Sequence, residues 1–473
     1  MKFFLLILFS ISTIFGSIDK KGRGKDNDKM VRPRNNLYKS EIGDNWKPLF
    51  NGKNLKGWEQ KGGKAIYKVE NGTITGTTVA NTMNSFLCTK KHYSDFILEY
   101  EVKYKNPEKP FNSGVQIRSN SFAEYRNGKI HGYQVEIDPS GRAWSAGIYD
   151  EGRRGWLYNL SHDEGARKAI KLDNWNKFRV EAIGNSIRTW LNGIPVANLV
   201  DDLTASGFIG LQVHNVKKGD EGRQIMWKNI RILTTNLEKA RTQTTAREIS
   251  SIPNTLSKDD IKEGWGLLFD GKTTKGWRSA HKTQFPAKGW KINNGELIVE
   301  AAKGEESGNG GDIVTIDQYS NFEFCLDFMI TEGANSGIKY FVTEKYNSNK
   351  SAIGLEFQIL DDKKHADAKK GVKGNRTIAS LYDLIPASES KKVNPPGRWN
   401  SAKIMVKGKH VEHWLNGGKV LEYERNNQMF DALVAYSKYK NYEGFGNWEK
   451  GHILLQDHGN EVHFRNIKIR NLK

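Results

Sequence analysis

The chain carries two copies of one sequence pattern, and this repeat limits its fold more than any other feature. Residues 49–58 return as residues 268–277, with Leu-Phe, Gly-Lys and Gly-Trp in the same places, and further matches follow in the same order. They are Asn112-Ser113-Gly114 with Asn335-Ser336-Gly337, Trp190-Leu191-Asn192-Gly193 with Trp414-Leu415-Asn416-Gly417, and Lys228-Asn229-Ile230 with Arg465-Asn466-Ile467. A unit of roughly 200 residues is far longer than a solenoid or propeller unit and can bury its own core. We therefore expect two tandem domains, residues 45–233 and 264–473, joined by a linker at residues 234–263.

Residues 1–16 have the layout of a secretory signal peptide. A lysine precedes an unbroken apolar run over residues 3–9, and small residues lead to an expected cleavage near Gly16. The run is too short to span a bilayer, which predicts a periplasmic or extracellular protein with no transmembrane segment after cleavage. The alternative is an uncleaved anchor, because a basic stretch follows at residues 20–29. Residues 17–44 are polar and aperiodic, and we expect a flexible basic tether there.

Charge and cysteine content limit the partners. The net charge of +19 suits a polyanion, either nucleic acid or an acidic polysaccharide, but also fits a generally basic solvated surface. Neither a basic helix nor an RNA-binding signature accompanies it, so no nucleic-acid partner is expected. The two cysteines, Cys88 and Cys325, occupy non-equivalent positions in the two repeats. We expect buried thiols there rather than a disulfide.

The hydrophobic pattern within each repeat has a period of two. Residues 96–104 and 322–328 alternate apolar and polar side chains, which indicates half-buried strands. Turns such as Asn192-Gly193 separate further short strands, and their residues accept positive φ, which favours hairpins. Many short strands and almost no helical pattern predict an all-β sandwich with jelly-roll character in each repeat. Trailing strands at residues 224–233 and 461–473 are expected to close the two sandwiches.

Four tryptophans recur at repeated positions, Trp58 with Trp277 and Trp190 with Trp414. Large aromatic side chains dominate the cores of small β-sandwiches, so we expect core positions for all four. The alternative is that some of them are platforms on which sugar rings stack.

Polar side chains gather on one face of a strand in each repeat. In residues 132–138 the period of two places Gln134, Glu136 and Asp138 on one face and apolar side chains on the other. The second repeat has Glu356 and Gln358 in the corresponding strand, with Glu and Gln exchanged. Such a face is either solvated or lines a groove, and carboxylates and amides suit a hydroxyl-rich ligand. Because the pattern occurs twice, we favour a groove.

Histidines and further carboxylates lie close to these strands in the sequence. Asp361 and His365 follow the second polar strand, and a His-Asp pair suits either a divalent cation or proton abstraction. Neither spacing is a dedicated metal motif, so a surface loop remains open. His214 and His458 end two equivalent Leu-Gln-x-His stretches and are candidate acids or bases.

The next equivalent segments contain Tyr149-Asp150 and Tyr382-Asp383. Arg154 lies just beyond the first of them and would either clamp a carboxylate or pair with neighbouring acidic residues. The sequence has no Gly-rich phosphate loop, nucleophile elbow or cysteine cluster, which disfavours nucleotide chemistry, serine hydrolysis and structural zinc.

The ordered set of motifs resembles the bacterial 3-keto-disaccharide hydrolase family, also described as 3-keto-glucoside-1,2-lyase/3-keto-2-hydroxy-glucal hydratase. Both repeats match over nearly their full length. The resemblance implies two concanavalin-like or jelly-roll sandwiches that act on 3-keto glycosides, with a divalent metal ion as an optional enolate stabiliser. It implies acid, base or metal roles for Glu356, Asp361, His365, His458, Glu136, Asp138 and His214. It implies substrate-binding roles for Asn335, Gln358, Tyr382, Asp383, Asn112, Arg118, Gln134, Tyr149, Asp150 and Arg154.

Three functions remain open at this point. The first is an exported enzyme that cleaves 3-keto glycosides, with one repeat specialised for binding. The second is a tandem lectin, because β-sandwiches of this kind often only bind glycans. The third is a surface protein that holds polysaccharide through its basic tether. The second repeat also inserts residues 436–450 before its Leu-Gln stretch, a loop that we expect to wall a pocket.

Overall fold

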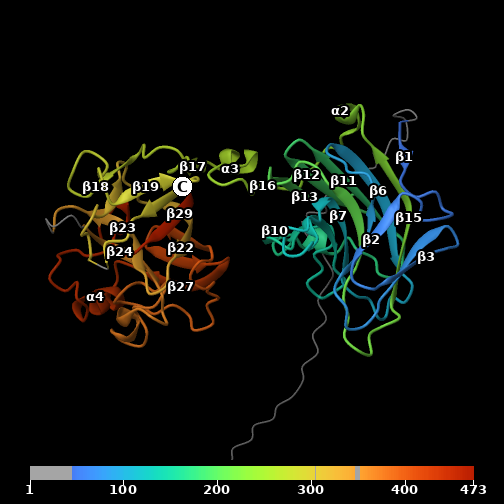
Figure 1. The fold of residues 1–473 in the computed structure, drawn as a ribbon. Helices are drawn as coiled ribbons and strands as arrows, with labels where there is room; N and C mark the ends of the chain where they lie inside the picture. Colours follow the sequence, from blue (N-terminus) through green and yellow to red (C-terminus); the bar gives the residue numbers. More distant parts are fainter. Residues whose placement is uncertain (1–44, 304, 347–351) are drawn as a thin grey trace, which may run out of the picture.

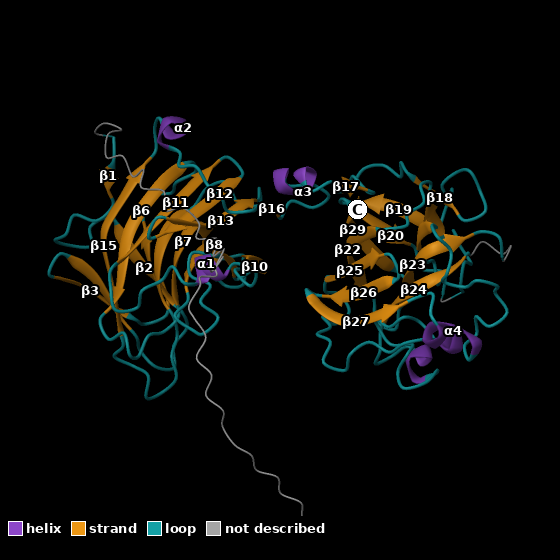
Figure 2. Ribbon diagram, turned by 180° about the vertical axis from the view of Figure 1, so that it is seen from behind, coloured by secondary structure: helices purple, strands orange, loops and turns teal. Residues whose placement is uncertain are grey.

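The computed structural model describes residues 45–303, 305–346 and 352–473. The expected signal peptide and tether lie outside this range. Figure 1 shows two bodies of strands, one formed by the first half of the chain and one by the second. Within the described residues, helices are short, and Figure 2 shows that strands dominate both bodies. The prediction of an all-β chain with two sandwiches is confirmed.

Two sheets build the first body. The first has the order β16-β13-β12-β11-β6-β15-β4-β3, with β1 beside β15, and the second has the order β10-β9-β8-β7-β14-β5-β2. Strands of the first sheet are β1 (Lys47–Pro48), β3 (Ile66–Glu70), β4 (Thr73–Thr77), β6 (Phe96–Tyr104), β11 (Asn176–Ile183), β12 (Ser186–Leu191), β13 (Ile194–Val200), β15 (Gln224–Leu233) and β16 (Glu248–Ser250). Strands of the second sheet are β2 (Trp58–Gly62), β5 (Ser85–Thr89), β7 (Ser113–Asn120), β8 (His131–Ile137), β9 (Ile148–Glu151), β10 (Gly155–Tyr158) and β14 (Phe208–Val213).

The second body repeats this plan with fewer strands. Its sheets have the orders β19-β20-β29-β22-β25-β26-β27, with β17 beside β29, and β18-β21-β28-β23-β24. The larger sheet contains β17 (Gly266–Leu267), β19 (Trp290–Asn293), β20 (Glu296–Val299), β22 (Phe322–Ile330), β25 (Asn400–Lys407), β26 (His410–Leu415), β27 (Gly418–Glu424) and β29 (Val462–Asn471). The smaller sheet contains β18 (Trp277–Ser279), β21 (Ile313–Thr315), β23 (Asn335–Thr343), β24 (Ile353–Leu360) and β28 (His452–Leu455). The expected trailing strands are β15 and β29, and each lies inside the larger sheet of its body, next to β6 or β22.

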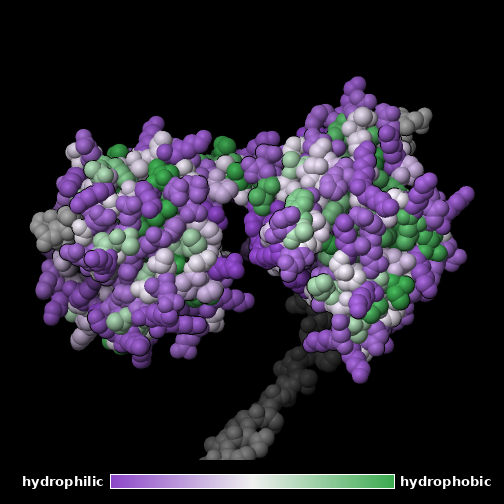
Figure 3. Space-filling model, in the orientation of Figure 1, coloured by the Kyte–Doolittle hydropathy of each residue, from purple (hydrophilic) through white to green (hydrophobic). Residues whose placement is uncertain are grey.

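The helices are single turns or little more. They are α1 (Glu164–Arg167), α2 (Leu237–Ala240), α3 (Lys258–Lys262), α4 (Gln428–Ala435) and the 3-10 turn η1 (Ala366–Lys369). None of the helices among the described residues is long and apolar enough to cross a membrane. On the face shown in Figure 3, hydrophilic side chains prevail and apolar ones are scattered.

The segment expected to be a linker is partly built into the first body. Its strand β16 pairs in parallel with β13 and so lengthens the larger sheet. Helix α2 also lies in this segment. The pairing could not be read from a three-residue strand without a hydrophobic period.

Three of the four tryptophans expected in the core are buried, Trp58, Trp277 and Trp190, whereas Trp414 is half-buried. Trp58 and Trp277 are buried in the two cores, and each donates its indole N–H to a backbone carbonyl nine residues earlier. Trp190 and Trp414 lie outside both core clusters, with Arg188 and Lys403 over their rings. The alternation of β12 and β26 places both rings on the outer face, because the adjacent Leu191 and Leu415 lie in the cores. Both cysteines are free thiols; Cys88 is buried and Cys325 half-buried.

Candidate functional site

A pocket of about 310 Å³ lies on the outer face of the smaller sheet of the first body. We call it the first pocket. Five residues singled out in the sequence line it: Asn112, Gln134, Glu136, Tyr149 and His214. Its other lining residues are Asn84, Arg142, Glu151, Trp156 and Gln212.

The alternation of β8 explains why polar side chains reach this face. Tyr133 and Val135 point into the core, while Gln134 and Glu136 point outward yet are only 2 % and 3 % exposed. Gly114 of β7 lies between Glu136 and Gln212 of β14 in the same row of the sheet. A side chain at Gly114 would collide with Gln134, so the glycine leaves the space into which that amide folds. The polar face is therefore a buried site rather than a solvated surface.

A chain of hydrogen bonds ends at the carboxylate of Glu136. Gln116 donates to Gln134 Oε1 (2.6 Å), and Gln134 donates to Glu136 Oε2 (2.8 Å). Asn112 donates to Glu136 Oε1. Burial raises the pKa of Glu136 to about 7, although both amide hydrogen bonds and nearby Arg142 favour the charged form. A carboxylate with such a pKa can accept and return a proton near neutral pH.

Gln212 is the clearest sign that this pocket takes a polar ligand. Its side chain is 1 % exposed, and neither its amide nitrogen nor its amide oxygen has a hydrogen-bond partner among the described residues. Buried amides in proteins are nearly always bonded, and leaving one unpaired costs about 1–3 kcal/mol. A ligand hydroxyl can both donate to and accept from such an amide. His214, at the edge of the pocket, is half-buried and bonds the carbonyl of Asn215.

Arg142 enters the first pocket from the turn after β8. Its Nε donates to Asp138 Oδ2 (2.8 Å), and its guanidinium lies 4.7 and 4.9 Å from the ring centroids of Trp144 and Trp156. Asp138 also accepts from the backbone of Ser140 and Trp144. Burial would raise the pKa of Asp138, but these hydrogen bonds and Arg142 hold it below its usual value. Asp138 therefore orients Arg142 and the turn, and it does not line the pocket.

The second body has a pocket at the same place on its smaller sheet, with a volume of about 210 Å³. We call it the second pocket. Its lining residues are Glu306, Lys339, Ala352, Ile353, Gly354, Glu356, Lys438, Tyr439, Tyr442 and Gln456. Three of them belong to the inserted loop at residues 436–450, which does wall the pocket as expected.

The second pocket carries a different electrostatic arrangement. Lys339 lies opposite Glu356 in the register of β23 and β24, where the first pocket has Gln116 opposite Gln134. Burial opposes the charge on Lys339, but Asp312, whose Oδ2 lies 3.6 Å from Nζ, keeps the pKa of Lys339 above its usual value. Burial also raises the pKa of Glu356, while the charges of Lys339 and Lys438 lower it.

Several buried polar atoms of the second body have no hydrogen-bond partner among the described residues. They include Asn335 Oδ1, Gln358 Oε1, Gln456 Oε1 and His458 Nδ1. The Gln456 backbone N–H bonds the carbonyl of Gly337, which pairs with Gln358, so the two amides flank that glycine. His458 lies edge to face with His365 at a centroid distance of 5.9 Å, and its Nε2 is 3.8 Å from Glu306. Burial and the charge of His458 lower the pKa of His365.

The remaining candidates of the second body have local structural partners. Asp361 accepts from the backbone of Gly333, Lys363 and Lys364, which caps a turn. The Tyr382 hydroxyl donates to Asp367, a bond that together with burial raises the pKa of Tyr382. Asp383 accepts from Arg376 and from the backbone of Lys438 at the pocket edge.

Three candidates of the first body lie away from the first pocket. Arg118 is 1 % exposed and donates to the carbonyls of Ser94 and Gly184 and to Asp95. Asp150 is fully buried and accepts from Arg153 and Arg154. Arg154 also donates two hydrogen bonds to Asp201. Neighbours on a strand face opposite sides, so Asp150 points away from the pocket that Tyr149 lines. These side chains hold ion pairs within the fold.

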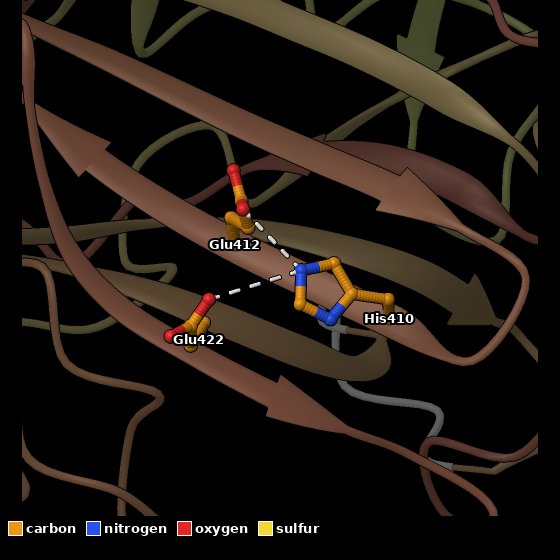
Figure 4. A group of neighbouring side chains, drawn as sticks. All are labelled: His410, Glu412 and Glu422. Atoms are coloured by element: carbon orange, nitrogen blue, oxygen red, sulfur yellow. Dashed lines mark hydrogen bonds and ion pairs between the residues drawn. The ribbon is translucent and has the colours of Figure 1, made fainter. Parts of the chain in front are cut away.

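One group of side chains in the described residues has spacing that could hold a metal ion: His410, Glu412 and Glu422 (Figure 4). It lies on β26 and β27 of the larger sheet and includes none of the residues that line the second pocket. Lys419 already bonds Glu412 Oε1 (3.3 Å) and Glu422 Oε2 (2.5 Å). Its ammonium takes the charge that a metal ion would supply, so this group does not identify a catalytic metal.

The sequence matches the family model described as the 3-keto-alpha-glucoside-1,2-lyase-like domain at residues 45–233 and again at residues 264–470. A 3-keto-disaccharide hydrolase of Bacteroides thetaiotaomicron is 36 % identical over 236 residues, an alignment that covers 44 % of this chain and 78 % of that protein.

Two solved structures also share similarity with parts of the chain. A putative glycosyl hydrolase of Parabacteroides distasonis is 32 % identical, with a TM-score of 0.42, and the match covers 47 % of this chain and 100 % of that one. A carbohydrate-binding module of Bacillus subtilis is 18 % identical, with a TM-score of 0.27, over 37 % of this chain and 95 % of that one. The two family-model matches span most of the described residues, and the chain therefore belongs to the family of 3-keto-alpha-glucoside-1,2-lyase-like domains.

Proposed function

We propose that this chain is an enzyme that cleaves 3-keto glycosides by elimination across C1 and C2, followed by hydration. Family membership and the related hydrolase support a carbohydrate-hydrolase function. The observation that carries the finer proposal is the first pocket, which is lined both by Glu136, with a pKa of about 7, and by the unpaired amide of Gln212. One group is suited to move a proton and the other to hold a sugar hydroxyl.

The chemistry follows from the substrate ketone. A carbonyl at C3 acidifies the hydrogen at C2, and the ionised Glu136 accepts that proton. The electron pair of the C2–H bond forms C2=C3, and the negative charge moves to the oxygen at C3. When C3=O forms again, C1=C2 forms and the bond from C1 to the leaving oxygen breaks. Water then adds across C1=C2, which makes the net reaction a hydrolysis.

The leaving oxygen needs a proton, and His214 at the edge of the first pocket is our candidate acid. Asn112 and Gln134 hold the carboxylate of Glu136 and Tyr149 lines the pocket beside it, so these three residues position base and substrate.

The second pocket is proposed to act on a related glycoside, with Glu356 as its base. Glu356 corresponds in register to Gln134, two residues from the position of Glu136. Two residues along a strand are about 7 Å, so the two carboxylates would meet different parts of one bound sugar. With Lys339 in place of Gln116, this predicts different substrates for the two pockets.

The test uses the full chain, a chromogenic 3-keto-glucoside and its unoxidised parent, with and without a chelator. Glu136→Gln, Glu356→Gln and the double variant are compared with Glu70→Gln, an exposed control outside both pockets. We expect the chromophore to be released from the keto compound alone. Each single variant should lose part of this release, and the double variant should lose all of it. Glycan binding without release would favour a lectin, and binding that vanishes with added salt would favour attachment through the tether. Loss of release with chelator would assign a metal requirement.

Export is proposed from residues 1–16 alone, which lie outside the described residues. Fractionation of cells that express the full chain tests it: the mature protein is expected in the periplasm or medium, shortened near Gly16. Full-length protein retained with membranes would contradict cleavage.

A further inference from the structure

Arg142 is held in the first pocket by contacts that leave both of its terminal amino groups free. Nε donates to Asp138, and the guanidinium stacks near Trp144 and Trp156, which themselves meet edge to face at 4.8 Å. Within the described chain, neither Nη1 nor Nη2 of Arg142 donates a hydrogen bond to a protein acceptor. Holding an arginine by Nε alone orients its two outer N–H groups together, as a planar fork.

The same pocket shows independently that a ligand belongs there. Gln212 is almost completely buried, and the part of the chain that the structure describes offers no partner to either of its amide atoms. Glu136 presents a carboxylate whose pKa is near neutral. The pocket thus contains an unused amide, a base and an arginine that is paired with Asp138 through Nε while its outer N–H groups are unused.

The proposed reaction needs a positive charge at one atom. When the C2 proton leaves, the oxygen at C3 becomes an enolate oxygen, and the barrier falls if a fixed donor already faces that oxygen. Lys339 is the buried cation of the second pocket, but its equivalent in the first pocket is the neutral Gln116. The first pocket must therefore obtain this charge from another element.

We propose that Arg142 stabilises the enolate oxygen in the first pocket, with its two outer N–H groups directed at the oxygen on C3. Asp138 is then a positioning residue that fixes the guanidinium. Arg142 donates hydrogen bonds and gives up no proton, so the C2 proton stays on Glu136 and the electron pair leaves with the oxygen on C1. This role rests on the proposed function of the same pocket.

The test is made in the full chain carrying Glu356→Gln, so that release reports the first pocket. Arg142→Met is expected to lower kcat about 10²- to 10³-fold, as loss of one oxyanion donor does elsewhere, with KM changed less than about threefold. The kcat of Arg142→Lys should lie between those of the parent and Arg142→Met, because a point charge replaces the planar fork of N–H groups. Arg241→Met, which removes an exposed ion pair with Glu238 on α2, is the matched control and should leave kcat unchanged.

A second readout separates catalysis from folding. Guanidinium ion, added at concentrations too low to unfold the protein, should restore part of the kcat of Arg142→Ala. Asp138→Asn should lower kcat without abolishing substrate binding. A kcat for Arg142→Met within threefold of the parent, or a raised KM with unchanged kcat, would overturn the role. If the parent chain releases nothing from the keto compound, the proposed function itself has failed.

Discussion

Gly337 faces the carboxylate of Glu356 so closely that a Cβ on the glycine would lie 2.4 Å from Glu356 Oε1. Gly114 has the same relation to the amide of Gln134 in the first pocket. The Asn-Ser-Gly motif of each repeat thus makes room for the polar side chain of the neighbouring strand. The glycine is needed for the space that it leaves, since neither Gly114 nor Gly337 has the positive φ that favours glycine.

Gly337→Ala should therefore impair the second pocket. The added methyl group would push Glu356 aside, and a displacement of 1 Å in a catalytic group can cost about 100-fold in rate. In a Glu136→Gln background we expect a large fall in kcat/KM for release from a 3-keto glycoside. Gly141→Ala is the control, because open space surrounds that position. Equal activity of the two alanine variants would contradict the proposed base.

The pH dependence of the first pocket should report Glu136. The base works when ionised, so in a Glu356→Gln chain kcat/KM should rise with pH and reach half its plateau near pH 7. Stability should change in the opposite sense. Because the folded state raises the pKa of Glu136 from 4.5 to about 7, its contribution is fully present below pH 4.5 and is lost as pH rises through 7. Glu136→Gln should flatten that part of the plot of unfolding free energy against pH. A rate midpoint near pH 4.5 would argue against this role.

Gln212→Leu should weaken substrate binding without destabilising the protein. The change removes a buried amide that lacks partners and substitutes a side chain of similar size, so the free energy of unfolding should be unchanged or increased. The same change removes the ligand contact, and KM should rise about tenfold, as loss of one good hydrogen bond predicts. Thermal unfolding and steady-state kinetics check both parts. A clear loss of stability with unchanged KM would mean that the amide serves the fold.

Asp150 should matter for stability and not for turnover. Asp150→Asn weakens a buried arrangement in which one carboxylate accepts from Arg153 and Arg154, and breaking such a pair typically costs about 3 kcal/mol. Asp202→Asn, at an exposed carboxylate, should change stability by less than about 0.5 kcal/mol. Chemical denaturation measures both. A loss of kcat in folded Asp150→Asn protein would return this residue to the substrate site.

The sequence predicted the strands well because a period of two is a direct consequence of strand geometry. The same alternation placed Gln134 and Glu136 correctly on the outer face. It also placed Asp138 in this row, but β8 ends at Ile137 and Asp138 does not line the first pocket. Arg142 was missed because loop residues carry no period that reveals their direction. Gln212 was part of the Leu-Gln-x-His pattern, and the unusual feature, its lack of any partner, exists only in the folded chain.

Ion pairs were the other weak point of the sequence interpretation. Arg154 and Asp201 are distant in sequence and meet through the folding of β10 against the end of β13. Because Arg154 pairs with Asp201 and Arg118 pairs with Asp95, these charged side chains stabilise the fold and do not line the first pocket. Local sequence patterns cannot show which carboxylate an arginine will reach.

The measurement that tests the central claim most directly is the isotope effect at C2. A 3-keto glucoside with deuterium at C2 is compared with its hydrogen form, using the full chain with Glu356→Gln and the same chain with Glu136→Gln added. The account predicts slower release from the deuterated compound in the first chain and no release in the second. Release at equal rates from both compounds, with Glu136 replaced or not, would contradict proton removal by Glu136.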